Sequence, residues 1–136
     1  MRAGYSKTPL VQKLGIKAGQ KAVVLNAPRG YRQTLGALPE GASVVESLSS
    51  ESEFIHLFTT ERGELEGKFA GLKRKLAPHG TLWISWPKCA AKAETDLKEN
   101  IVREIGLKNG LVDVKVCAVD EVWSGLKFVY RLKDRV

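Results

Sequence analysis

The sequence predicts a three-layer α/β fold with a mostly parallel sheet of about six strands and a C-terminal antiparallel hairpin. Three observations lead to this prediction. Short apolar, β-forming runs alternate with helical segments along most of the chain. Residues 65–76 carry apolar side chains at helical spacing between two such runs. Finally, the β-forming segments 111–118 and 123–132 are joined by too few residues for a helix, which indicates a hairpin.

The first half of the chain predicts short elements with clear boundaries. In order, we expect a helix from the N-cap Thr8 to the stop at Gly15, a buried strand at 21–25, a helix at 31–38, and strands at 41–46 and 53–60. The link 47–52 between the last two strands is too short for a helical crossover, so the place of strand 41–46 in the sheet stays open.

The second half gives stronger periodic signals. A helical stripe is formed by Leu65, Phe69, Leu72 and Leu76. Residues 78–80 end this helix, and a strand is expected at 81–86. A last helix is predicted to begin near Asp96, because Glu99 completes a pattern like a capping box, and to end at residues 109–110.

Length and composition indicate one domain, residues 1–136, in which residues 1–17 form an N-terminal arm and the short first helix. No apolar run is long enough to cross a membrane, and the first residues lack the apolar core of a signal peptide. Cys89 and Cys117 lie in no metal-binding motif. We therefore expect a cytoplasmic protein with no membrane partner and no metal site.

The run Leu76-Ala77-Pro78-His79-Gly80-Thr81-Leu82-Trp83-Ile84 resembles the "L-x-P-G-G-x-L" junction of class I S-adenosylmethionine-dependent methyltransferases. The resemblance covers about residues 18–132 and implies a Rossmann-like sheet that ends in a hairpin. The chain also resembles a family of small uncharacterised bacterial proteins, a domain of unknown function. This second resemblance rests on residues 5–10, 85–88 and 110–116 and implies no activity.

The sequence departs from the methyltransferase pattern where the cofactor would bind. The family's glycine-rich loop is replaced by residues 26–30, which contain one glycine and a proline without a backbone donor. Glu46 does follow the second strand, where an acid usually holds the ribose. No Asn/Asp-Pro-Pro-Tyr motif follows the strand at 53–60. S-adenosylmethionine is therefore disfavoured as a cofactor, enzymatic activity stays uncertain with the balance against it, and no catalytic residue is assigned.

We expect a ligand site at the carboxyl ends of the strands, where open parallel sheets bind their ligands. Arg29 and Gly30 precede a short helix, where they form either an anion-binding turn or a structural surface, and Trp86 offers either a stacking face or a core side chain. The predicted ligand-binding residues are Asn26, Arg29, Gly30, Tyr31, Glu46, Ser85, Trp86 and Lys88. His56, mid-strand among apolar residues, is expected to be a satisfied core or interface histidine.

The net charge of +7 comes entirely from residues 1–39, which hold seven basic residues and no acid. The leading hypothesis is non-catalytic binding of a small anionic or nucleotide-like ligand, or of a protein partner. The first alternative is an atypical S-adenosylmethionine-dependent methyltransferase. A further alternative is nucleic-acid binding through the basic N-terminal region. The oligomeric state stays open, and Trp123 in the hairpin is either a core side chain or a dimer contact.

Overall fold

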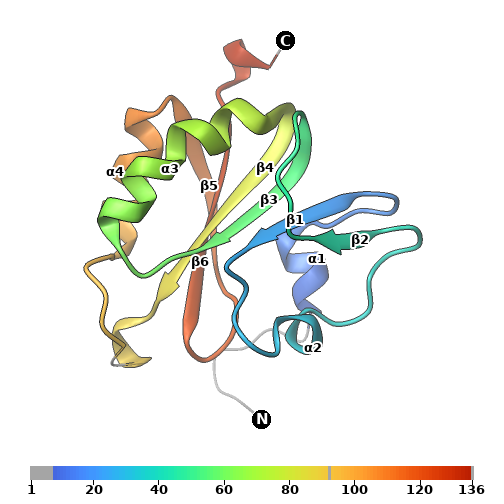
Figure 1. Cartoon of the computed structure of the whole chain (residues 1–136), viewed down its shortest axis with the longest axis horizontal. Helices are drawn as coiled ribbons and strands as arrows, with labels where there is room; N and C mark the ends of the chain where they lie inside the picture. Colours follow the sequence, from blue (N-terminus) through green and yellow to red (C-terminus); the bar gives the residue numbers. More distant parts are fainter. Residues whose placement is uncertain (1–7, 92, 136) are drawn as a thin grey trace.

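The computed structural model describes residues 8–91 and 93–135, which form a six-stranded sheet with the strand order β2-β1-β3-β4-β6-β5 (Figure 1). The strands are β1 (Lys21–Leu25), β2 (Ser43–Val45), β3 (Ser52–Phe58), β4 (Leu76–Pro87), β5 (Leu111–Ala118) and β6 (Trp123–Tyr130). Strands β1 to β4 are parallel, and β6 runs antiparallel to both β4 and β5. The predicted mostly parallel sheet with a C-terminal hairpin is confirmed. Residues 1–7 of the predicted arm lie outside the described residues.

Helices cover both faces of the sheet and complete the three layers. They are α1 (Leu10–Leu14), α2 (Tyr31–Leu35), α3 (Arg62–Lys75) and α4 (Glu99–Lys108), with short 3-10 turns at Cys89–Ala91 and Leu132–Asp134. Helices α1 and α2 pack on one face and α3 and α4 on the other, so the core is divided into two clusters by the sheet. Among residues 8–91 and 93–135, no helix is both long and apolar enough to span a membrane.

The strand β3 shows how the sequence builds both clusters. Successive side chains of a strand point to opposite faces. Ile55 and Leu57 therefore contact the α3 and α4 side, whereas Phe54 and Phe58 contact the α1 and α2 side. All four side chains are buried. A strand covered on both faces needs apolar residues at nearly every position, which is the pattern that the sequence carries here.

Three helix boundaries differ from the prediction. Pro9, rather than Thr8, occupies the N-cap position of α1. The helix expected over residues 31–38 ends at Leu35, because Gly36 adopts a φ of 91° that a helix does not allow. Leu76, expected as the last apolar residue of a helical stripe, instead begins β4 and pairs with Ser52.

The predicted capping box at Asp96 and Glu99 is wrong, because Asp96 caps a different helix. Its Oδ1 accepts a hydrogen bond from the backbone N–H of Arg62, the first residue of α3, at 2.7 Å. The helix α4 begins three residues later at Glu99, with Lys98 as its N-cap. A contact between residues 34 positions apart has no signal in the local sequence.

The structure settles the place of the second strand. β2 lies at the sheet edge beside β1, in the register Lys21 to Ser43. Since β1 separates β2 from β3, residues 46–51 must cross β1, and they do so without a helix. The strand order therefore reverses around β1, and the carboxyl ends of β1 and β3 form the switch point at which such sheets bind ligands.

Candidate functional site

Asn26 joins the two strands of the switch point. It follows β1 with a φ of 59°, a left-handed conformation that asparagine tolerates better than most residues. Its Nδ2 donates a hydrogen bond to the backbone carbonyl of Phe58, the last residue of β3, at 3.2 Å. On the other side of β3, the backbone N–H of Thr59 donates to the carbonyl of Ser85 at 3.0 Å. These bonds fix the ends of β1, β3 and β4 relative to each other.

A carboxylate lies at this edge, near the beginning of α3, and protein donors satisfy it. The Thr59 hydroxyl donates to Glu64 Oε1, and Lys68 Nζ donates to Glu64 Oε2 at 3.0 Å. The hydrogen bond from Thr59 is the main cause that lowers the pKa of Glu64; partial burial opposes it, while Lys68 and Asn26 lower the pKa further. Glu64 is thus held ionised by its neighbours, which indicates a structural role.

An open pocket of about 800 Å³ lies between the carboxyl ends of β1 and β2 and the outer side of α3; we call it the β1–β2 pocket. Asn26 and Ala27 line it from the end of β1, and Glu46 lines it from the end of β2. Glu46 is exposed, so its carboxylate is available to a ligand. The volume lies within the range of roughly 300–1,000 Å³ typical of small-molecule sites.

The α3 wall of the β1–β2 pocket combines small residues with positive charge. Gly67 and Gly71 lie one turn apart on this side of the helix, and a Cβ at Gly67 would meet no atom within 4 Å. Lys68, Arg74 and Lys75 add three cations to the same wall. The sequence did not predict this wall, because the residues opposite the apolar stripe of α3 were expected only to be the polar side of the helix. The spacing of its glycines, residues 63, 67 and 71, was the available signal.

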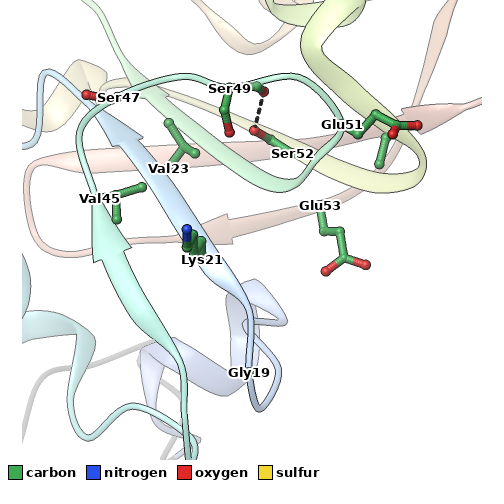
Figure 2. A pocket seen from close by; sticks show the side chains of 10 residues that line it. Gly19, Lys21, Val23, Val45, Ser47, Ser49, Glu51, Ser52 and Glu53 are labelled. Carbon is green, nitrogen blue, oxygen red and sulfur yellow. Dashed lines mark hydrogen bonds between the residues drawn. The ribbon is translucent and has the colours of Figure 1, made fainter.

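A second pocket, of about 720 Å³, lies on the same face of the sheet toward the amino end of β1 (Figure 2). Val23 and Val45 line it from the two strands, together with Lys21. The crossing segment closes one side, where the Ser52 hydroxyl donates to the carbonyl of Ser49 at 2.7 Å (dashed in Figure 2). The two pockets therefore flank the helix-free crossing.

The turn after β1 divides the predicted residues between surface and core. Arg29 and Gly30 are exposed, and Gly30 has a φ of 83° at the N-cap of α2. This helix has only five residues, so its dipole gives little support for an anion. Tyr31, in contrast, is buried, and its hydroxyl lies 3.1 Å from Nδ1 of His56.

The predicted residues of β4 do not share one crevice, because neighbouring strand residues face opposite sides. Ser85 is buried on the α2 side, where its hydroxyl lies 2.7 Å from Nε2 of His56. Trp86 is buried in the cluster under α3 and α4, so its ring offers no stacking face. Lys88 is half-buried, and its backbone N–H donates to the carbonyl of Val122 at 2.7 Å.

His56 lies at the centre of a buried chain of polar contacts that runs from Tyr31 in α2 to Ser85 in β4. Its two ring nitrogens meet the hydroxyls of Tyr31 and Ser85, and its ring stacks on Phe58 at 4.2 Å between centroids. Burial lowers the pKa of His56 to about 3 and raises the pKa of Tyr31 well above its usual range. The imidazole is therefore neutral, and the interpretation of His56 as a satisfied core histidine is confirmed.

Solved structures resemble this chain, although no protein-family model matches it and no curated protein does. A SAM-dependent methyltransferase from Aquifex aeolicus has a TM-score of 0.57 at 18% identity, over 87% of this chain and 86% of that chain. A TehB-like SAM-dependent methyltransferase from Corynebacterium glutamicum has a TM-score of 0.56 at 12% identity, over 89% of this chain and 85% of that chain.

A further resemblance is to magnesium protoporphyrin IX methyltransferase from Synechocystis, with a TM-score of 0.56 at 11% identity, over 90% of this chain and 78% of that chain. The LepI structure with SAM has a TM-score of 0.52 at 11% identity, over 81% of this chain, which spans only 36% of the LepI chain. The expected fold resemblance to S-adenosylmethionine-dependent methyltransferases is thereby confirmed.

Proposed function

We propose that this chain is an atypical S-adenosylmethionine-binding protein on the methyltransferase fold, with the adenosine portion of the ligand in the β1–β2 pocket. One observation carries the proposal: Asn26 and Glu46, which follow neighbouring parallel strands, line the same pocket of about 800 Å³. A carboxylate at the corresponding place in dinucleotide-binding sheets accepts a hydrogen bond from a ribose hydroxyl. The fold of the solved structures described above supports the same ligand class.

The residues fit one part of this ligand better than the other. Glu46 and the open space beside Gly67 suit a ribose and an adenine ring. The turn after β1 suits the methionine portion less, because Ala27 carries a side chain into the pocket wall and Pro28 has no backbone N–H to donate. We therefore place only the adenosine in the pocket and derive no methyl-transfer step from it.

An adenine nucleotide is the second candidate ligand, and the charge of the α3 wall favours it. Arg74 and Lys75 are exposed and line the pocket. Within the described residues neither forms an ion pair. Their charges would attract phosphate groups, whereas S-adenosylmethionine carries no phosphate. Non-catalytic binding of a nucleotide-like anion thus uses the same pocket with a different set of contacts.

A thermal-shift and calorimetric titration with S-adenosylmethionine, S-adenosylhomocysteine, ATP and inorganic phosphate distinguishes these ligands. At about 100 times its Kd, a ligand stabilises the fold by about 2.7 kcal/mol, which corresponds to a rise in Tm of roughly 9 °C for a chain of this length. The proposal expects this rise with the adenosyl ligands. A rise with ATP and phosphate alone would instead establish the nucleotide-like anion.

Three variants locate the binding site. Glu46→Gln removes the charged acceptor and is expected to weaken adenosyl-ligand binding about tenfold, the value of one charge-assisted hydrogen bond. Arg74→Gln is expected to weaken only phosphate-bearing ligands. Glu40→Gln is the matched control, since Glu40 is exposed and lies outside the pocket lining. Adenosyl-ligand binding that is unchanged in Glu46→Gln would contradict the assigned site, and no response to any ligand would contradict the function.

A further inference from the structure

Four lysines from distant parts of the chain gather on the face of the sheet opposite the β1–β2 pocket. We call Lys13, Lys17, Lys115 and Lys127 the lysine patch. Lys13 lies in α1 and Lys17 in the following turn, while Lys115 lies in β5 and Lys127 in β6. Lys115 Nζ donates a hydrogen bond to the backbone carbonyl of Lys13 at 3.2 Å, which ties the edge of the sheet to α1.

The arrangement of these lysines is electrostatically unfavourable for the isolated chain. Lys115 and Lys127 are direct cross-strand partners in the β5–β6 ladder. Like charges directly opposite each other destabilise a sheet. Burial is the main cause that lowers the pKa of Lys127, and the charges of Lys115 and Lys17 lower it further. The charged form of Lys127 is therefore destabilised by its neighbours, and a bound anion would offset this repulsion.

Within the part of the chain that the structure describes, no carboxylate pairs with these four lysines, although Asp120 and Glu121 line a surface pocket together with Lys13. The sequence around Lys13 and Lys17 supplies no carboxylate either, because the first acidic residue of the chain is Glu40. Other cations are also unpaired, as Arg74 and Lys75 are. The lysine patch differs from those two because Lys115 and Lys127 lie directly opposite each other in a sheet ladder.

We propose that the lysine patch binds the phosphate backbone of a nucleic acid. Its charges lie on a helix, a turn and two strands, which suits a series of phosphates better than one small anion. Lysine ammonium groups act as point charges that neutralise phosphates and carry no base preference by themselves. Binding at this surface is therefore expected to be independent of sequence. The site lies on the other side of the sheet from Glu46, so it depends in no way on the proposed adenosyl ligand.

Fluorescence anisotropy with a labelled single-stranded RNA of about 20 nucleotides and a DNA duplex of similar length tests the patch. The full chain is titrated at several salt concentrations. Affinity is expected to fall steeply with salt, because each neutralised phosphate releases counterions. The slope of log K against log salt is negative. In Lys115→Gln/Lys127→Gln its magnitude on single strands is expected to fall by about 1.4, since two phosphate contacts are lost. The affinity is expected to drop tenfold or more.

The control is Lys98→Gln/Lys108→Gln, which removes the same charge from α4 on the opposite face. A second patch variant, Lys13→Gln/Lys17→Gln, leaves the β5–β6 ladder intact and is expected to weaken binding as well. The Tm of Lys115→Gln/Lys127→Gln is expected to stay constant or rise, because a repulsive pair is removed. Equal losses in the patch and control variants would overturn the proposal, as would binding to anionic lipid vesicles with none to either nucleic acid.

Discussion

Buried His56 makes the stability of this fold depend on pH over a range in which few other groups titrate. The ring is fully buried, and burial lowers its pKa to about 3 from an ordinary value of 6.5. The unfolded chain therefore binds a proton as the pH falls below about 6.5, while the folded chain does not. Protonation stabilises the unfolded state, so the free energy of unfolding must decrease with falling pH until the folded-state pKa is reached.

The two pKa values set the size of this effect. Between pH 7.5 and pH 5.0, one such histidine lowers the free energy of unfolding by about 2 kcal/mol. Glu64 acts in the same direction, because its pKa is lowered in the fold and its contribution is lost on acidification. Its loss occurs below the ordinary carboxyl pKa of about 4.5, outside this interval. The interval therefore isolates the histidine.

Urea denaturation at pH 7.5 and 5.0, followed by circular dichroism, measures this difference. His56→Gln is expected to be less stable at pH 7.5 by about 1–3 kcal/mol, because a hydroxyl of Tyr31 or Ser85 loses its partner. Its pH dependence, however, is expected to shrink by about 2 kcal/mol. The exposed His79 provides the control, since His79→Gln should retain the full pH dependence. A wild-type change smaller than about 0.5 kcal/mol would refute a neutral buried imidazole.

Three further substitutions test the helices α3 and α4. Asp96→Ala removes the side-chain acceptor of the Arg62 N–H, and is expected to cost about 1 kcal/mol in urea denaturation, whereas Asp96→Asn retains an acceptor and should cost less. Gly106→Ala would place a Cβ into the ring of Phe128, so it is expected to destabilise by about 3 kcal/mol or more. Gly67→Ala meets open space in a helix and should instead stabilise by about 0.5–1 kcal/mol; equal effects of the two substitutions would contradict the close approach of α4 to β6.

The sequence predicted the sheet well, because its information on this point is local. The run at residues 53–60 is apolar enough to identify a strand covered on both faces, and the short link before Trp123 allows only a hairpin. The observed strands β3 and β6 agree with these expectations within two residues. Glu46, which follows the second strand, was singled out through the resemblance to methyltransferases, in which an acid at this point holds the ribose, and it lines a pocket with Asn26.

The rest of the site depends on which elements cover each face of the sheet, and the pattern of a single strand does not contain this information. Ser85 and Trp86 both lie near the end of β4, but strand alternation sends their side chains to opposite faces. Trp86 faces α3 and α4, so whether its ring reaches a ligand depended on how completely those two helices cover the end of β4. Arg74 and Lys75 line the pocket because no helix joins β2 to β3. The side of α3 that faces β2 is therefore left uncovered. Both outcomes follow from tertiary arrangement rather than from local propensity.

The helix-free crossing from β2 to β3 also has a consequence for motion. Residues 46–51 cover part of β1 with a loop, while β3, β4 and β6 are covered by α3 and α4. β2 contributes only three residues and none of them is fully buried. Segments with few buried apolar contacts open at lower free energy than the whole domain unfolds. We therefore expect the β1–β2 edge to open independently of the larger core, so that any ligand in its pocket would also order the strand that helps to bind it.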